Sequence, residues 1–263
     1  MSALAMTVSD TLVLAQRNLM RIPRQPDLLV AYTIQPVMFV LLFVYVFGGA
    51  IELALPPTIP YVDFLMPGII IQTAIFTATQ TGVGLAEDLK KGLVDRFKSL
   101  PMARSAVLAG RTLADSGAIV FQTLLMLVVA FLVGFRFHAG LPKAALAIAG
   151  ACAVGYAFTW LAAVAGLWLR SVEAVQAASF TVIFPFVFAS SAFVPANTFP
   201  HWLRTWSSIN PVSIWVETFR VLTLGDLYPT TSTLTSLLLR STAWFLGFLI
   251  VFVPLSVRRY RRT

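Results

Sequence analysis

The chain has 263 residues, of which 58% are hydrophobic and 11% are charged, and its mean hydropathy is +0.84. Soluble domains are roughly 45–50% apolar and about 25% charged, so this composition excludes an ordinary soluble enzyme and indicates an all-α, polytopic integral membrane protein. The net charge of +8 does not indicate a nucleic-acid partner, because most basic residues flank the apolar segments, as membrane anchors do.

Six apolar segments are long enough to cross about 30 Å of hydrocarbon. We expect transmembrane helices at residues 29–50, 62–84, 106–134, 144–168, 174–194 and 234–256, which together form one membrane domain, 1–263. An excess of Lys and Arg marks the cytoplasmic side of a membrane protein. With six spans, both termini lie inside the cell (N-in, C-in), and 14 of the 19 basic residues fall on that side. The other five (19 minus 14) are Arg136, Lys143, Arg204, Arg220 and Arg240.

The segment before the first span has an amphipathic pattern. Residues 8–22 place their apolar side chains on one side of a helix, with Arg17 and Arg21 elsewhere. This pattern predicts an interface helix within residues 1–28 that lies on the inner membrane surface. A disordered tail is the alternative.

Residues 87–105, between the second and third spans, form a polar island. Positions 87–104 carry eight charges in eighteen residues. We expect Glu87 and Asp88 in the first turn of a short helix, where the helix dipole favours acids, and an end at Pro101. An apolar ridge of this helix would fit a groove on a soluble domain. Alternatively, its basic groups would lie on lipid phosphates, and the pattern alone leaves both open. The ridge comprises Leu89, Leu93, Phe97 and Leu100.

The fourth span contains Ala162 and Gly166, four residues apart. Small residues at this spacing allow helices to approach closely in a membrane. The contact could lie within one subunit or between subunits, and the sequence favours neither.

Residues 195–228 predict two short helices near the outer face, at about 200–208 and 211–224. Asn210 caps the second helix and Pro211 occupies its first position. With Pro200 and Trp202 before it, the segment is typical of a re-entrant element at the membrane interface. Glu217 and Arg220 are three positions apart on this helix, so the two could pair on one face.

The sequence carries no pattern that indicates chemistry within the chain. It has no phosphate-binding loop of the form G-x-x-x-x-G-K-[S/T], and its His, Cys and acidic residues do not cluster as metal ligands do. Ionisable residues deep in the spans are scarce, which argues against a proton-coupled carrier; Asp115 is explained by an ion pair with Arg111. We therefore expect a chain that is not an enzyme, binds no cofactor or metal itself, and takes its energy from a separate subunit.

Two groups of residues carry a resemblance to a known family. The chain resembles the membrane subunits of type-2 ABC transporters, and among them the daunorubicin-resistance permeases of the DrrB kind. The family has an acidic pair, a Gly, an Arg and a Leu-Pro between its second and third spans, and a Pro, Trp and Asn-Pro pattern before its last span. Here the matching residues are Glu87-Asp88, Gly92, Arg96, Ser99-Leu100-Pro101 and Arg104, and then Phe199-Pro200-His201-Trp202-Leu203, Asn210-Pro211 and Arg220.

The resemblance implies a permease subunit of an ATP-driven exporter in the bacterial cytoplasmic membrane. It implies two copies of a separate ATP-binding subunit that hold ATP and Mg, a second permease chain (an identical copy or a homologue), surrounding lipids, and a hydrophobic or amphipathic substrate such as a drug, antibiotic, natural product or lipid. An exporter of polysaccharide or teichoic-acid-like polymers is the alternative, and a non-transport scaffold or sensor is a further one. The implied ATPase-coupling residues are Glu87, Asp88, Leu89, Gly92, Leu93, Arg96, Phe97, Leu100, Pro101 and Arg104.

Overall fold

The computed structural model describes residues 26–92, 104–230 and 232–262, and within these residues it contains helices and no strand. The long helices in chain order are α2 (Pro26–Leu41), α4 (Tyr61–Lys90), α6 (Arg104–Leu132), α7 (Leu141–Leu169), α8 (Val172–Phe188) and α11 (Leu234–Arg262). The shorter elements are η2 (Leu42–Phe47), α3 (Gly48–Glu52), η3 (Ala196–Thr198), α9 (His201–Ile209), α10 (Pro211–Leu224) and η4 (Gly225–Leu227).

Among the described residues, five helical segments are long and apolar enough to cross a membrane, where the sequence predicts six. The difference lies in the predicted span 174–194, because α8 has only 17 residues and ends at Phe188. Serine side chains end it: the Ser190 hydroxyl bonds to the Val187 carbonyl, and the Ser191 backbone N–H donates to Ser213 Oγ at 3.1 Å. At 1.5 Å per residue, α8 is about 26 Å long. The five segments are Ile34–Glu52, Tyr61–Lys90, Leu108–Leu132, Leu141–Leu169 and Leu234–Tyr260.

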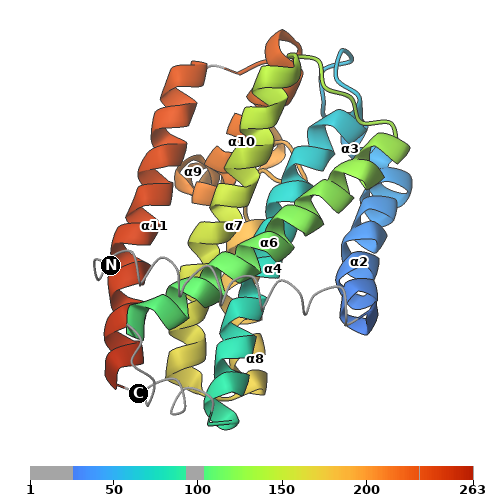
Figure 1. The fold of residues 1–263 in the computed structure, drawn as a ribbon. Coiled ribbons are helices and arrows are strands. Elements are labelled where there is room, and N and C mark those ends of the chain that lie inside the picture. The colour runs from blue at the N-terminus through green and yellow to red at the C-terminus, as the bar shows by residue number, and fades with distance from the viewer. Residues whose placement is uncertain (1–25, 93–103, 231, 263) are drawn as a thin grey trace.

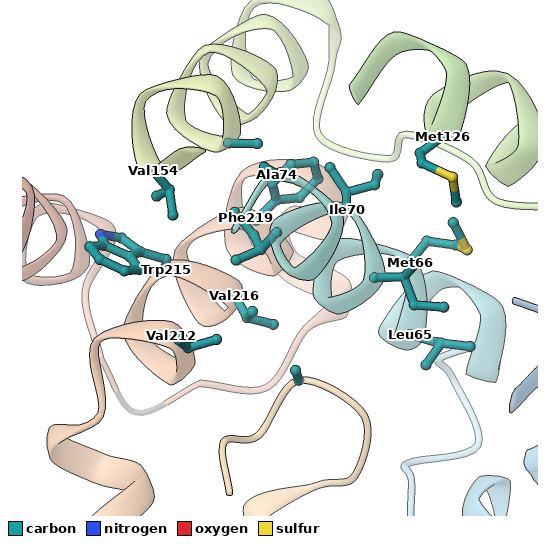
Figure 2. Close-up of a cluster of buried hydrophobic side chains, with 14 of the residues drawn as sticks. Leu65, Met66, Ile70, Ala74, Met126, Val154, Val212, Trp215, Val216 and Phe219 are labelled. Carbon is teal, nitrogen blue, oxygen red and sulfur yellow. The ribbon is translucent and has the colours of Figure 1, made fainter. Parts of the chain in front are cut away.

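Helix α4 is the central element of the bundle (Figure 1). Most of its residues from Tyr61 to Ala86 are buried, and its apolar side chains form the main core with α6, α7 and α10. Figure 2 shows part of this core, where α4 faces Met126 of α6 and the side chains of α10. Helix α4 contacts α6, α7, α8 and α10, so a displacement of either of its ends would affect most of the bundle.

Helices α4 and α7 approach closely through small residues. A methyl group added at Gly82 would lie 2.4 Å from the Ala162 carbonyl oxygen, and one added at Gly166 would lie 2.3 Å from the Gly82 carbonyl oxygen. Such distances are far inside van der Waals contact, so only glycine allows the two backbones to meet here. The predicted small-residue contact of the fourth span is therefore made within one chain.

Helices α2 and α11 lie at opposite sides of the bundle (Figure 1). Both expose large apolar side chains, including Met38 and Tyr45 near α2 and Leu239 and Ile250 on α11. In a membrane these surfaces face hydrocarbon or another apolar partner. The first helical stretch is also irregular, because residues Leu42–Phe47 form a π-helix, a geometry that is rare and frequent at functional sites.

Candidate functional site

The acidic pair of the predicted coupling region lies at the end of α4. Glu87 and Asp88 occupy the last turn of this 30-residue helix, and not the first turn of a separate short helix as the sequence suggested. Helix α4 continues past its apolar residues into the charged ones, because no proline interrupts the chain between Ala86 and Lys90. The backbone N–H of Lys91 closes the helix on the Glu87 carbonyl at 2.9 Å, and Gly92 follows with φ +67°.

Asp88 is held by Arg111 of α6. Arg111 Nη1 lies 2.9 Å from Asp88 Oδ2, and Arg111 Nε lies 3.0 Å from Asp115 Oδ2. The Arg111–Asp115 pair was predicted, whereas the link to Asp88 was not. Gly84 makes the link possible, because a methyl group added there would lie 1.7 Å from Arg111 Nη2. We call Gly84, Asp88, Arg111 and Asp115 the α4–α6 joint.

Basic side chains compensate an unfavourable interaction between the acidic pair and the helix dipole of α4. Carboxylates near the C-terminus of a helix are disfavoured by the helix dipole, and Glu87 and Asp88 both stand there. Arg111 neutralises Asp88, while Lys91 Nζ lies 3.1 Å from Glu87 Oε2 in an exposed pair. The end of α4 therefore presents a solvated pair of opposite charges beside a partly buried ion-paired joint, in which the side chains of Arg111 and Asp88 are 20% and 23% exposed.

Leu89 does not contribute to a free apolar ridge. It packs against a second core cluster that includes Leu85, Leu108 and Trp160, at the same end of the bundle. Arg104 is the first residue of α6. The other predicted coupling residues, Leu93, Arg96, Phe97, Leu100 and Pro101, lie outside the described residues, as do Arg17 and Arg21 of the predicted interface helix.

The predicted pair of short helices is confirmed at the other end of the bundle. Helix α9 begins at His201 after Pro200, and its Trp202 is 71% exposed. Helix α10 begins at Pro211, and Asn210 caps it: Asn210 Oδ1 accepts from the Val212 backbone N–H at 2.9 Å. The Asn210 amide also donates to the Phe186 carbonyl at 2.8 Å, so the cap fastens α10 to α8.

Arg220 of α10 does not pair with Glu217, contrary to the sequence expectation. Glu217 Oε1 accepts from the Thr230 hydroxyl at 2.9 Å. Arg220 is only 1% exposed, and its guanidinium donates to the carbonyls of Phe64 at 2.9 Å and Ala192 at 2.8 Å. It also lies 3.5 Å above the centre of the Phe64 ring. These contacts, which we call the Arg220 clamp, join α10, α4 and the turn after α8.

A buried carboxylate near the clamp has no counterpart in the sequence predictions. Asp63, in the first turn of α4, is 3% exposed. It accepts from the Arg136 backbone N–H at 3.0 Å and lies 3.0 Å from His138 Nε2, so it fastens the loop between α6 and α7. Within the described ranges, no three His, Cys, Asp or Glu side chains gather to hold a metal ion.

A polar groove lies between α2 and α4, with a volume of about 240 Å³. One part of its lining is apolar and aromatic, and the other part consists of amides and hydroxyls. The Thr77 hydroxyl bonds to the Thr73 carbonyl of its own helix at 2.8 Å. The glutamine amides, which carry both donors and acceptors, are the groups suited to bind a ligand. The lining residues are Gln35, Pro36, Phe39, Gln72, Thr73, Phe76, Thr77, Thr79 and Gln80.

The sequence does contain a signal for this groove, although the sequence predictions missed it. Gln72, Thr73, Thr77 and Gln80 repeat at helical spacing inside an apolar span, so they share one side of α4. A search for ionisable groups alone overlooks such neutral residues. Neutral amides are nevertheless costly in hydrocarbon unless they bind something.

Comparison with known proteins places the chain among transport proteins. Residues 9–224 match the family described as ABC-2 type transporter. The chain is 32% identical to the daunorubicin resistance ABC transporter permease protein DrrB1 of Streptomyces coeruleorubidus, over 98% of this chain and 88% of that protein. It is 27% identical to the probable doxorubicin resistance ABC transporter permease protein DrrC of Mycobacterium tuberculosis, over 99% of this chain and 91% of that protein.

Proposed function

This chain belongs to the ABC-2 type transporter family, and on that basis we propose that it is the permease subunit of an ATP-driven exporter in the bacterial cytoplasmic membrane. It moves a hydrophobic or amphipathic substrate outward, such as a drug, an antibiotic, another natural product or a lipid. ATP and Mg are held by a separate ATP-binding subunit, present in two copies. The observation that carries the proposal is the 32% identity with a daunorubicin resistance permease over 98% of this chain.

The orientation follows from charge. The C-terminal ends of α4 and α11 lie at one end of the bundle, together with the start of α6 (Figure 1), and they carry Lys90, Lys91, Arg258 and Arg262. An excess of basic residues favours the cytoplasmic side for this end. With α8 and the turn after it counted as a sixth crossing, both termini lie inside the cell. The segment with α9 and α10 then lies at the outer side.

The polar groove supports the class of substrate. Phe39 and Phe76 offer aromatic surface, while Gln72 and Gln80 offer neutral hydrogen-bonding groups, and the lining contains no charged side chain. Such a lining suits a molecule that is mostly apolar and carries hydroxyl, carbonyl or amino groups. A strongly charged substrate would lose its hydration without gaining an ion pair.

A second permease chain is expected beside the groove. Gln35 is exposed and Gln80 is half-buried, so without a partner their amides would face hydrocarbon, where unpaired polar groups are costly. The neighbouring surface also exposes a stack of aromatic rings on α8, where the rings of Phe180 and Phe184 lie 4.8 Å apart and those of Phe184 and Phe188 lie 4.0 Å apart. Packing a second chain against this side would cover both features and enclose a path between the two subunits.

The α4–α6 joint supports the position of the ATP-binding partner. Glu87 and Lys91 are exposed at the end of α4, next to the segment that the family resemblance assigns to coupling. A force applied there reaches α6 through Arg111 and the rest of the core through α4 itself. The conformational change of the partner on ATP binding is thus transmitted to the helix that lines the groove.

Transport in reconstituted vesicles tests this proposal. Daunorubicin is added to the medium around inside-out vesicles that contain this chain and its ATP-binding subunit. Its uptake into the lumen is followed by fluorescence quenching. We expect uptake with ATP and Mg, and none with a partner subunit that binds ATP but cannot hydrolyse it. Equal uptake with the two partner forms would contradict an ATP-driven mechanism. Hydrolysis that no amphipathic compound stimulates would contradict the proposed class of substrate.

A further inference from the structure

A second groove lies away from the polar one, between α7, α10 and α11. Its volume is about 170 Å³, and its lining is almost entirely apolar. Gly150 and Val154 line it from α7, Phe219 from α10, and Leu238 and Phe245 from α11. Helices α7 and α11 are both long and apolar enough to cross a membrane, so in a membrane the open side of this groove would face the lipid. Two of the lining residues, Val154 and Phe219, are labelled in Figure 2.

Four polar or hydrogen-bonding side chains line this groove, and three of them, those of Trp215, Thr218 and Ser241, already bond within the chain; the fourth is Thr242. Thr218 Oγ1 lies 2.7 Å from the Ile214 carbonyl and 2.7 Å from Ser241 Oγ. The Trp215 indole N–H donates to the Ser241 carbonyl at 3.1 Å. The groove therefore offers little to a polar ligand or to water, and an apolar occupant loses no hydrogen bond on entering it.

The groove has room for a chain of carbon atoms. A methyl group added at Gly150 would meet no atom within 4 Å, so the wall of α7 is recessed at this position. An apolar cavity of about 150 Å³ accommodates a benzene ring, so 170 Å³ accommodates an apolar segment of similar size. From Leu146 to Val154 the α7 wall rises by about 12 Å, which gives the groove an elongated shape along the helix.

A cation lies above the groove on the same face of α7. Lys143 is exposed in the first turn of this helix, and positions 143, 147, 150 and 154 follow the spacing of one helical face. Lys143 is thus about 10 Å from Gly150 along the helix axis, near the surface at the α9–α10 end. A lysine at this height can bind a phosphate group while its stem covers apolar surface.

We propose that this groove is a binding site for an anionic phospholipid of the leaflet at the α9–α10 end, with one acyl chain between α7, α10 and α11 and the headgroup phosphate at Lys143. The observations that carry the proposal are the almost entirely apolar lining, the recess at Gly150 and the cation above it. The site lies on the side of α7 that faces α11, and it is independent of the proposed transport function.

Native mass spectrometry of the purified full chain tests the proposal. The protein is extracted in a mild detergent and incubated with equal amounts of phosphatidylglycerol and phosphatidylcholine of matched acyl chains. We expect the wild-type chain to retain one phosphatidylglycerol. Gly150→Phe, which fills the recess, should lower the amount of retained lipid at least fivefold. If the phenylalanine variant does not fold, Gly150→Leu fills the recess with a smaller side chain. Lys143→Gln should retain lipid without preferring phosphatidylglycerol.

Two control variants make the result specific. Gly247 of α11 also has open space around an added methyl group but does not line the groove, so Gly247→Phe should retain lipid as the wild-type chain does. Arg258 is exposed at the opposite end of the bundle, so Arg258→Gln should keep the preference for phosphatidylglycerol. Retention by the Gly150 variants equal to that of Gly247→Phe would overturn the proposal, as would an unchanged headgroup preference in Lys143→Gln.

Discussion

Two arginines fasten α4 to its neighbours, one at each end of the helix, and their surroundings differ. Arg220 is 1% exposed and binds two backbone carbonyls and an aromatic ring. The side chain of Arg111 is 20% exposed and binds two carboxylates. Hydrogen bonds between a buried guanidinium and backbone carbonyls are costly to break, because water does not reach these groups to replace the lost partners. Ion pairs that water reaches can be rearranged at a smaller cost.

The difference between the two arginines suggests that the two ends of α4 have different roles. We infer that the end with the Arg220 clamp, which also contains the Asp63–His138 contact, is the fixed end of the bundle. We propose that the end with the α4–α6 joint receives the force of the ATP-binding partner. Movement between the two would open or close the polar groove, because α4 provides most of its lining. The following variants test each end separately.

The largest effect on stability is expected from Arg220→Met. This change removes both donors from the Phe64 and Ala192 carbonyls as well as the cation above the Phe64 ring, so we expect a loss of about 3 kcal/mol or more in the free energy of unfolding. The measurement is the midpoint temperature at which the detergent-solubilised protein loses its monodisperse form. Arg204→Met is the matched control, because the exposed Arg204 also donates to two carbonyls, those of Asn197 and Phe199. Equal midpoints for the two variants would contradict the fixed-end role of the clamp.

A smaller effect on stability and a larger one on transport are expected from Gly84→Leu. The new side chain would occupy the place of the Arg111 guanidinium and break both of its ion pairs. Because these pairs are partly exposed, the loss of stability should be about 1–2 kcal/mol, while daunorubicin transported per ATP hydrolysed should fall severalfold.

The control for this variant is Gly247→Leu, in which a glycine with free space around it receives the same side chain. Transport by Gly84→Leu at the level of Gly247→Leu would mean that the α4–α6 joint carries no force.

The smallest effect on stability is expected from Glu87→Lys. The exposed Glu87–Lys91 pair contributes about 0.5 kcal/mol or less, so the unfolding midpoint should hardly change. Stimulation of ATP hydrolysis in the partner by this chain should nevertheless fall, because the reversed charge opposes docking. The control is Glu52→Lys: Glu52 is the exposed last residue of α3, at the other end of the bundle (Figure 1), and its reversal should leave the stimulation intact. A Glu87→Lys variant that stimulates its partner fully would exclude Glu87 from the docking surface.

The sequence predicts local features of this fold well. The helices α9 and α10, the Asn210 cap and the start at Pro211 depend on residues that are neighbours in the chain, and so does the Arg111–Asp115 pair one turn apart. The placement of Glu87 and Asp88 was wrong for a local reason, since charged residues extend a helix beyond an apolar span as readily as they begin a new one.

The contacts of Arg220 could not be predicted in this way. Its partners are backbone carbonyls at Phe64, 156 residues away, and at Ala192, 28 residues away, and every residue carries a carbonyl. Glu217 was the obvious partner by spacing and charge, but its carboxylate accepts a hydrogen bond from the Thr230 hydroxyl instead. The pairing of Asp88 with Arg111 could likewise not be predicted, because Gly84, the residue that lets Arg111 reach Asp88, reveals its role only when α4 and α6 are packed together.

We propose that the α4–α6 joint transmits the conformational change of the ATP-binding partner to the membrane helices. The most direct test is the ratio of daunorubicin transported to ATP hydrolysed in vesicles that contain the partner and the folded Arg111→Gln variant. We predict that hydrolysis continues while this ratio falls at least tenfold, because the end of α4 is no longer tied to α6. A ratio equal to that of the wild-type chain, at equal rates of hydrolysis, would contradict the claim.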